Sequence, residues 1–362
     1  MIKNNYCVIM AGGVGSRFWP LSTNSKPKQF LDILGIGKTL LQQTFERFEN
    51  LCPCENIFIV TNAIYKDLVI EQLPKIKESQ VLLEPSRRNT APCIAYANYK
   101  IQQINPEAKI VVAPSDHLIL KEKKFEKTIK EAFNFVDNNN VLLTLGMKPN
   151  RPETGYGYIQ VSNEEKDDKF SINKVKTFTE KPDRELAKVF YESGDFYWNS
   201  GIFIWSLKTI MSSFEIHLPE INSLFSQGIP LYNTDKEEDF IKKTYSECRN
   251  VSIDYGIMEK AKNVYVFCAE FGWSDLGTWG SLYEHTKKDT DQNSIKGKNV
   301  LTYDTNKCIV NVPDEKLVVI QGLDNYIVVD AKNSLLICKK EDEQQIRQFV
   351  NDISVKKGDK YL

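Results

Sequence analysis

Two cationic side chains follow a glycine-rich turn near the start of the chain. The segment AGGVGSRFWPLSTNSKPKQF, residues 11–30, contains Gly12 and Gly13 directly after an apolar run, and then Arg17 and Lys28. Glycines let the backbone approach a ligand closely and can adopt positive φ, which leaves amide groups pointing at an anion. Arginine and lysine stabilise phosphate oxygens whose charge rises as pyrophosphate leaves. The segment therefore predicts a triphosphate site.

This turn differs from the two common phosphate-binding motifs. Arg17 stands where the dinucleotide fingerprint needs its third glycine, and no Gly-Lys-Ser/Thr follows as a P-loop requires. Trp19, Pro20 and Pro27 are expected to keep the loop rigid, because proline fixes φ. The alternative to a phosphate-binding role is a solvated loop that carries surface cations.

Two carboxylates in separate motifs are candidate metal ligands. Asp116 belongs to PSDH, which directly follows the apolar run IVVA (110–113), and Asp275 belongs to FGWSDLGTW (271–279). A carboxylate at the carboxyl end of a parallel strand lies in the ligand crevice of an α/β sheet. Mg²⁺ takes one or two such carboxylates together with phosphate oxygens. The alternative for either residue alone is a turn or a helix N-cap.

The elements that must position these residues alternate between strand and helix. Apolar runs predict strands, and amphipathic or small-residue stretches predict the helices between them, over the first 145 residues. This rhythm is typical of βαβ units and predicts a Rossmann-like α/β fold with a mixed, mostly parallel sheet flanked by helices. The expected strands are 6–11, 57–61, 81–83, 110–113 and 141–145, and the expected helices are 40–48, 66–73, 91–103 and 125–136.

The rest of the chain changes character twice. Residues 151–205 are rich in glycine, aromatic residues and β-formers, which predicts an inserted, partly antiparallel layer, and 209–262 are mainly helical in pattern. Four apolar runs then begin nine residues apart, at positions 307, 316, 325 and 334. A fixed short period predicts rungs of a β-solenoid, or a small β-meander, followed by a helix at 340–352. We expect a catalytic domain at 1–288 and a short C-terminal domain at 289–362, β-helix-like and suited to oligomerisation.

These motifs together resemble the mannose-1-phosphate guanylyltransferase family of sugar nucleotidyltransferases. The glycine loop alone would indicate only the superfamily, whereas the segment at 84–92 combined with Lys28-Gln29-Phe30 is more specific to the guanylyl branch. The matching segments run in family order: AGGVGSRFWPLS (11–22), PKQF (27–30), EPSRRNTAP (84–92), PSDH (114–117), TGYGYI (154–159), TEKP (179–182), WNSGIF (198–203) and FGWSDLGTW (271–279). The resemblance implies a nucleotide-diphospho-sugar transferase fold.

The resemblance also implies a role for each matching residue. Arg17, Lys28, Asp116 and Asp275 would be the catalytic group. The phosphates of GTP would be held by Gly12, Gly13, Arg17 and Lys28, and the guanine and ribose would lie at Glu84, Asn89 and Thr90. Mg²⁺ would bind to Asp116 and Asp275, and Asp116 is also part of the nucleotide site. The mannose pocket would be shaped by Gly155, Tyr156, Glu180, Asn199 and Gly201, and the phosphate of mannose 1-phosphate would contact Lys181.

The implied reaction is transfer of GMP from GTP to mannose 1-phosphate, which gives GDP-mannose and pyrophosphate. The nucleophile is already a phosphate, largely dianionic at neutral pH with a second pKa near ~6, so no general base is required. Two alternatives stay open: another sugar-1-phosphate nucleotidyltransferase, and a non-catalytic GDP-mannose-binding regulatory paralogue. A dehydrogenase fits the opening strand but not the cationic glycine loop.

Composition excludes several other classes. Lys and Arg total 47 against 48 Asp and Glu, a net charge of −1, so no broad nucleic-acid surface is expected. No run reaches the ~18 apolar residues of a membrane helix, and no secretion signal is seen. The eight cysteines lack zinc spacing and are expected to be reduced thiols. We expect a cytoplasmic homodimer, and, because the chain ends at Leu362, an enzyme without the isomerase domain of longer family members.

Overall fold

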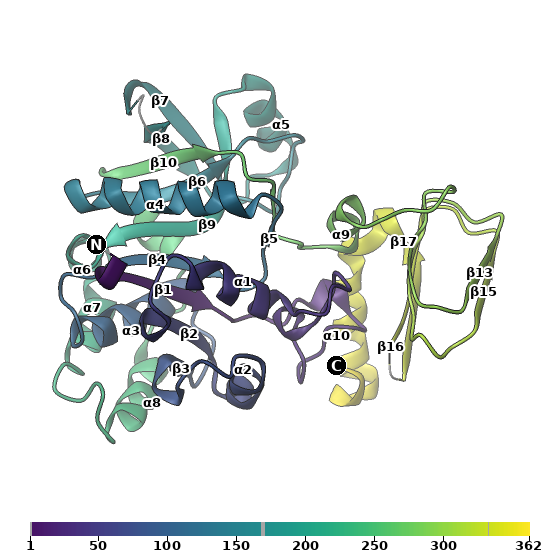
Figure 1. Ribbon diagram of the computed structural model, residues 1–362, viewed down its shortest axis with the longest axis horizontal. Helices are drawn as coiled ribbons and strands as arrows, with labels where there is room; N and C mark the ends of the chain where they lie inside the picture. Colours follow the sequence, from purple (N-terminus) through teal and green to yellow (C-terminus); the bar gives the residue numbers. More distant parts are fainter. Residues whose placement is uncertain (1, 168–170, 332) are drawn as a thin grey trace. The chain divides into compact units, whose positions relative to one another are not determined.

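The computed structural model describes residues 2–167, 171–331 and 333–362 (Figure 1). These residues form two compact units. Unit 1 comprises the chain up to residue 12 together with 44–115 and 119–273, and unit 2 comprises 13–43, 116–118 and 274–362. The glycine loop and Asp116 therefore fold with the C-terminal part of the chain.

Unit 1 is built on one nine-stranded mixed sheet (Figure 1). Its strand order is β3-β2-β1-β4-β9-β6-β10-β8-β7; β3, β2, β1 and β4 are parallel, as are β6 and β10, whereas β9 runs antiparallel to β4 and β6. The strands are β1 Asn5–Met10, β2 Ile57–Asn62, β3 Val81–Glu84, β4 Lys109–Pro114, β6 Leu142–Met147, β7 Tyr158–Asp167, β8 Ile172–Thr179, β9 Phe196–Ser206 and β10 Val264–Ala269. The mixed α/β sheet expected from the sequence is confirmed.

The strands between 151 and 205 are antiparallel, as expected, and they are part of the main sheet. β9 hydrogen-bonds to both β4 and β6, and β7 and β8 extend the same sheet beyond β10. The physical reason lies in β9 itself, which is buried along most of its length on both faces. Such a strand is stable in the middle of a sheet that is covered on both sides.

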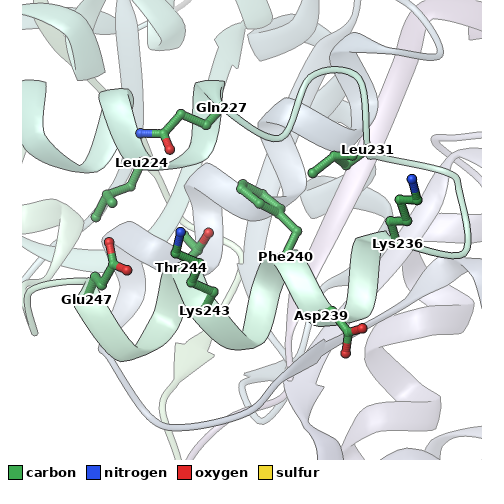
Figure 2. Close-up of a pocket in the computed structure, with 9 residues that line it drawn as sticks. All are labelled: Leu224, Gln227, Leu231, Lys236, Asp239, Phe240, Lys243, Thr244 and Glu247. Atoms are coloured by element: carbon green, nitrogen blue, oxygen red, sulfur yellow. The ribbon is translucent and has the colours of Figure 1, made fainter.

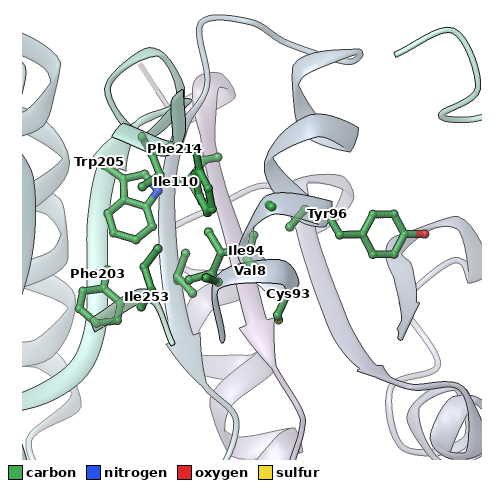
Figure 3. Packing of buried hydrophobic residues seen from close by; sticks show 14 of the residues in the cluster. Val8, Cys93, Ile94, Tyr96, Ile110, Phe203, Trp205, Phe214 and Ile253 are labelled. Carbon is green, nitrogen blue, oxygen red and sulfur yellow. The ribbon is translucent and has the colours of Figure 1, made fainter. Parts of the chain in front are cut away.

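Helices cover this sheet and bury a large apolar core. Helix α3 is buried on almost every side, as its small and apolar residues require, and α6 packs with it. Figure 3 shows Val8 and Ile110 of the sheet meeting Ile94 of α3 and Phe214 of α6. The helices are α1 Leu40–Glu49, α2 Lys66–Gln72, α3 Thr90–Gln102, α4 Glu122–Asn138, α5 Arg184–Ser193, α6 Leu207–His217, α7 Pro219–Ser226, α8 Glu237–Glu247 and the π-helical turn η7 Asp254–Met258.

Unit 2 joins the glycine loop to a small β-solenoid. Its core packs Phe18 of the loop against Trp279 of α9, with ring centroids 5.0 Å apart, and continues to α10. The elements are the 3₁₀ turns η2 Ser16–Phe18, η3 Lys28–Phe30 and η8 Lys340–Gln345, helices α9 Trp279–His285 and α10 Ile346–Lys357, and strands β12 Ser294–Lys296, β13 Val300–Tyr303, β14 Ile309–Asn311, β15 Val318–Gln321, β16 Tyr326–Ala331 and β17 Ser334–Lys339. Short strands β5 Leu118–Ile119 and β11 Trp273–Ser274 lie where the chain passes from one unit to the other.

The nine-residue spacing belongs to rungs of eighteen residues. β14 pairs in parallel with β16 through Ile309 and Ile327, and β13 pairs in parallel with β15 through Val300 and Val318. These partners are 18 residues apart because the runs that begin at 307, 316 and 325 alternate between two sheets, whereas the run at 334 lies in the same sheet as the run at 325. β17 then reverses and pairs antiparallel with β16.

Candidate functional site

The ammonium group of Lys28 is the centre of the polar cluster in unit 2. Its Nζ atom lies 2.7 Å from Oδ2 of Asp116 and donates to the main-chain oxygens of Asp275 at 2.9 Å and Leu276 at 3.0 Å. The side chain is 5% exposed, so these three acceptors match the three N–H donors of a buried ammonium. Three of the four predicted catalytic residues, Lys28, Asp116 and Asp275, are thus brought together.

The glycine loop can reach this arrangement only because of Gly15. Its φ of 74° is left-handed, and a Cβ added there would lie 2.6 Å from Cβ of Lys28. Gly13 also has a positive φ, 83°, as expected, whereas Gly12 is not among the glycines at positive φ. Gln29 donates from Nε2 to the oxygen of Gly13 at 3.2 Å and holds the turn. The loop backbone is therefore fixed from both sides.

Arg17 is placed beside the same cluster. Its Nε donates to Oε1 of Gln344 at 2.8 Å, and its Nη1 donates to the oxygen of Gly277 at 3.4 Å. The loop 275–277 thus accepts hydrogen bonds from both predicted cations. Asp275 also accepts from the amide of Gly277 at its own Oδ1, 2.9 Å away, which is the turn geometry that its sequence context allowed.

The carboxyl of Asp116 stays ionised because of its neighbours. Burial acts to raise its pKa, but the positive charge of Lys28 and the nearby His117 outweigh that effect, and the pKa is lowered below its usual range. Nε2 of His117 is 3.9 Å from Oδ1. Asp116 is therefore an anion held against a cation, which is the state a metal ligand requires.

The predicted base-binding residues are tied to the segment 245–254 of unit 1. Tyr245 donates its hydroxyl to Oε1 of Glu84 at 3.0 Å, and Nε of Arg88 donates to the oxygen of Tyr245 at 3.0 Å. Asn89 is the N-cap of α3 and accepts from the amide of Thr90 at 2.9 Å. Thr90 in turn accepts at Oγ1 from the amide of Ile253 at 2.8 Å.

Glu84 is a buried acid whose proton affects stability. Burial raises the pKa of Glu84 to about 7, and the hydrogen bond from Tyr245 and the charge of Arg87 only partly offset this. The folded protein therefore holds a proton that the unfolded chain releases near ~4.3. The stability contributed by this proton is complete below pH ~4.3 and is lost as the pH rises through about 7.

Replacing Glu84 by glutamine is accordingly expected to stabilise the protein at high pH. The amide is neutral at every pH and can still accept from Tyr245. The stability of Glu84→Gln relative to the wild type should increase between pH 5 and pH 9, by up to ~3 kcal/mol in free energy of unfolding. The difference between the two melting temperatures should increase in the same direction. Differential scanning calorimetry without nucleotide measures it. A difference that does not change with pH would contradict the raised pKa.

A bulge in β9 presents Asn199 at the predicted sugar site. Thr144 of β6 pairs with Phe203 of β9, and Gly146 pairs with Asn199. Two steps along β6 therefore correspond to four steps along β9, which places extra residues in β9. Gly201, with φ 70°, lies inside this irregularity. Such bulges re-aim side chains and are frequent beside active sites. The segment WNSGIF is therefore a bulged strand.

Asn199 is held by three polar neighbours. Its Oδ1 accepts from Thr144 Oγ1 at 2.9 Å and from the amide of Gly201 at 3.3 Å, and its Nδ2 donates to Oδ1 of Asp254 at 3.0 Å. Burial, and then the charge of Glu180, raise the pKa of Asp254 to about 7. Asp254 therefore belongs to the same polar group as the predicted sugar-binding residues Glu180 and Asn199.

Glu180 and Lys181 form an ion pair next to an aromatic wall. Nζ of Lys181 lies 2.6 Å from Oε1 of Glu180, whose side chain is 9% exposed, while that of Lys181 is 60% exposed. Tyr156 packs against Trp198 and Trp273 with ring centroids 5.0 and 5.1 Å away. The amide of Lys181 donates to the oxygen of Tyr156 at 3.2 Å, so the wall and the ion pair are joined through the backbone.

Two glycines of TGYGYI behave differently. Gly155 is exposed and its amide donates to Glu153 at 3.1 Å. Gly157 is buried, and a Cβ there would overlap Oε2 of Glu180 and lie 3.3 Å from Cβ of Asn199. Gly157 thus provides the space in which the Glu180 carboxylate lies.

Three of these loops contain a non-glycine residue with a positive φ, which is a strained backbone conformation. Asn89, Lys181 and Leu276 have φ values of 68°, 48° and 43°, which non-glycine residues rarely adopt. They are three of the nine such residues in the described chain, and each lies in or directly beside a predicted site segment. Strain of this kind persists only where surrounding contacts impose it, and it is common at functional sites.

Nothing in the described ranges resembles a closed metal centre. No three His, Cys, Asp or Glu side chains come together there as a ligand set. The donors near Lys28 are carboxylate and carbonyl oxygens, a set that suits a hard cation completed by substrate oxygens. The residues therefore fit a metal that binds together with a phosphate ligand.

A hollow in unit 1 lies apart from the predicted site residues. Figure 2 shows a cavity of about 600 Å³ around Phe240 of α8, and it contains none of the predicted site residues. It is lined by Leu224, Gln227, Leu231, Lys236, Asp239, Phe240, Lys243, Thr244 and Glu247. We assign it no role in the reaction.

Sequence reasoning missed three residues of these clusters. Asp254, Thr144 and Tyr245 come from segments to which no motif was assigned. The one available signal was Asp254, the single charged residue in the mainly apolar stretch SIDYGIM. A lone acid among apolar residues needs a polar partner, and here that partner is Asn199.

Comparison with known proteins settles the family. A model of the nucleotidyl transferase family matches residues 6–292, and a model of the "MannoseP isomerase/GMP-like beta-helix domain" matches 298–353. A mannose-1-phosphate guanylyltransferase of Escherichia coli is 35% identical over 356 residues, which cover 96% of this chain and 75% of the relative. The chain belongs to the mannose-1-phosphate guanylyltransferase family. It is thus a nucleotidyltransferase enzyme, as expected.

Two further proteins are similar over nearly the whole chain. The alginate biosynthesis protein AlgA of Pseudomonas syringae pv. tomato is 36% identical over 350 residues, 95% of this chain and 70% of the relative. A crystal structure described as a mannose-1-phosphate geranyltransferase from Thermus thermophilus superposes with a TM-score of 0.86 at 28% identity, over 97% of this chain and 99% of that one. The β-helix-like C-terminal part expected from the sequence is confirmed by these matches; the boundary between residues 288 and 289 stays a prediction.

Proposed function

We propose that this protein transfers GMP from GTP to mannose 1-phosphate and releases GDP-mannose and pyrophosphate. The observation that carries the proposal is the similarity, across 96% of the chain, to a relative named for this activity. The side-chain clusters of the two units add support. Unit 2 gathers cations and carboxylates suited to phosphates, and unit 1 gathers short polar groups and aromatic rings suited to a sugar.

The reaction needs alignment and charge neutralisation more than proton transfer. An oxygen of the sugar phosphate attacks the α-phosphorus of GTP in line; one P–O bond forms there, and the bond to the bridging oxygen of pyrophosphate breaks. Arg17 and Lys28 would stabilise the departing pyrophosphate. In this structure Lys28 already has three acceptors, so a phosphate contact requires one of them to be exchanged.

Asp116 and Asp275 would hold the divalent cation, which we propose to be Mg²⁺. When bound, the ion supplies positive charge to the reacting phosphates. The carboxylate of Asp116, which now faces Lys28, would be shared between the ammonium group and the metal. Lys28 thereby keeps the Asp116 carboxylate ionised and in place before substrates bind.

Base and sugar recognition follow from the donors and acceptors of unit 1. Guanine offers an N1–H and a 2-amino group, and Glu84 is the acceptor we propose for it. Glu180 and Asn199 would bind sugar hydroxyls beside the Tyr156 wall. Lys181, the more exposed partner of its ion pair, would meet the phosphate of mannose 1-phosphate.

The direct test is pyrophosphate release with Mg²⁺, using four nucleoside triphosphates against mannose 1-phosphate and glucose 1-phosphate. Release with GTP and mannose 1-phosphate alone supports the proposal. Release with another pair keeps the reaction type and replaces the substrates. No release from folded protein that still binds GDP-mannose would favour the regulatory paralogue.

Substituting Gly157 by alanine is expected to damage sugar binding selectively. The new Cβ overlaps Oε2 of Glu180, so the carboxylate must leave its place beside Gly157. The KM for mannose 1-phosphate should rise about 10-fold, the loss of roughly one hydrogen bond, while the KM for GTP stays within about 2-fold. Steady-state kinetics with each substrate varied in turn measure both. Equal increases in the two KM values would contradict a role confined to the sugar pocket.

Three further expectations stay predictions. A homodimer can be checked by light scattering at micromolar concentration, the lack of phosphomannose isomerase activity by assay of the pure protein, and a cytoplasmic location by cell fractionation. Among the helices of the described residues, none is long and apolar enough to span a bilayer.

A further inference from the structure

Asp254 contacts the predicted sugar site without belonging to any motif that the family resemblance assigned. It is the first residue of the π-helical turn η7, and its Oδ1 accepts from Nδ2 of Asn199 at 3.0 Å. Turns of this type are rare in proteins, and those that occur are often found at functional sites. The proposed reaction already has an ionised phosphate as nucleophile, so it gives Asp254 no proton to remove.

We propose that Asp254 is a positioning residue that fixes the side-chain amide of Asn199 in the orientation that reads the hydroxyl groups of the sugar phosphate. This inference rests on the proposed function and adds to it a residue that determines sugar specificity.

The contacts around Asn199 define one orientation of its amide. Its Oδ1 faces two donors, the hydroxyl of Thr144 at 2.9 Å and the amide of Gly201 at 3.3 Å, while Nδ2 faces the carboxylate. Rotating the amide by half a turn would set its NH₂ against the Gly201 N–H and its oxygen against Asp254. Oδ1 of Asp254 is the acceptor that faces the NH₂ group, so Asp254 favours the observed orientation together with the donors Thr144 and Gly201 on the other side of the amide.

A fixed amide offers the sugar a defined donor. The NH₂ group of asparagine has two N–H bonds, and Asp254 takes one of them. The second therefore has a fixed direction. Two sugar phosphates that differ at a single hydroxyl are distinguished when a site provides a donor that only one of them can satisfy.

The backbone that carries Asp254 is held independently of the sugar site. The amide of Ile253 donates to Thr90 Oγ1 at 2.8 Å, the amide of Ala91 donates to the oxygen of Val251 at 3.1 Å, and the amide of Val251 donates to the oxygen of Arg88 at 3.3 Å. Asp254 is thus presented from a segment that is bonded to the start of α3. A side chain on such a rigid base can orient a neighbour without being ordered by it.

The test compares Asp254→Ala, which removes the acceptor, with Asp254→Asn, which can still accept through its amide oxygen. In Asp254→Ala we expect the KM for mannose 1-phosphate to rise about 10-fold, with kcat changed less than about 3-fold and the KM for GTP within about 2-fold. Discrimination between mannose 1-phosphate and glucose 1-phosphate should fall with it. Asp254→Asn should recover most of the loss.

A double-mutant cycle with Asn199→Ala separates positioning from other roles. If Asp254 acts through Asn199, its removal has no further effect on the KM for the sugar phosphate once Asn199 is alanine. An additive effect, or an Asp254→Asn variant as impaired as Asp254→Ala, would show that Asp254 acts through its own charge and would overturn the inference. Unchanged sugar kinetics in folded Asp254→Ala would also overturn it.

Two checks keep the outcome interpretable. Circular dichroism confirms folding, and if Asp254→Ala does not fold, Asp254→Ser takes its place in the same cycle. Wild-type turnover with GTP and mannose 1-phosphate is measured first, because its absence means failure of the proposed function. If the wild type uses a different sugar 1-phosphate, the cycle is run with that substrate and the inference about Asp254 is decided there.

Discussion

Replacing either Asp116 or Asp275 by asparagine is expected to lower kcat by about 10²-fold or more, because each change removes a negative charge from the proposed metal site. Asparagine has nearly the same shape as aspartate. Oδ1 of residue 275 can still accept from the amide of Gly277, and Lys28 bonds to the main-chain oxygen there, so the loop geometry should persist. In Asp275→Asn the loss would then report the charge, whereas Asp116→Asn also removes the ion-pair partner of Lys28.

The measurement is pyrophosphate release at saturating GTP and mannose 1-phosphate over a range of Mg²⁺ concentrations. Both variants should need more Mg²⁺ for half-maximal activity than the wild type. Asp289→Asn is the matched control, because Asp289 also lies in unit 2 and accepts turn amides from Asp291 and Asn293. It should keep normal turnover. Near-normal turnover in both site variants would end the metal assignment.

Five of the nine strands of the sheet, β1 to β4 and β6, were predictable because their burial patterns are local. The run YCVIMA gave β1 within one residue at each end, and IFIVT gave β2 in the same way. An uninterrupted apolar run between polar segments is sufficient to identify a buried strand. Likewise, the glycine loop and its two cations were visible as residue types at a spacing. Their role in holding the 275–277 carbonyls was not, since those partners lie 247 residues or more along the chain.

Contacts that depend on a local irregularity could not be predicted. The bulge that aims Asn199 at Thr144 arises from a mismatch between β6 and β9, which no single segment encodes. The nine-residue spacing was visible, but the choice of partner eighteen residues away depends on which runs share a sheet. Asp254 was missed for the same reason, because only the fold brings it to Asn199.

The second large effect expected is on stability, from replacing Lys28 by methionine. Methionine fills similar space but leaves the Asp116 carboxylate and two carbonyl oxygens without their ammonium partner. Removing one member of a buried ion pair typically costs about 3–5 kcal/mol. Asp116 keeps 29% of its side chain exposed, so water can solvate part of its charge. We therefore expect a loss of about 3 kcal/mol, the lower end of that range.

Urea denaturation of the full chain measures this loss, and a double-mutant cycle assigns it. Adding Asp116→Asn to Lys28→Met removes the unpaired charge, so the double variant should be more stable than the sum of the single effects predicts, by at least ~1 kcal/mol. A loss below ~0.5 kcal/mol in Lys28→Met would place the pair among ordinary surface ion pairs. A large loss with no coupling would mean that Lys28 stabilises unit 2 through the 275 and 276 carbonyls alone. Coupling, in contrast, would show that the ion pair between Lys28 and Asp116 itself stabilises unit 2.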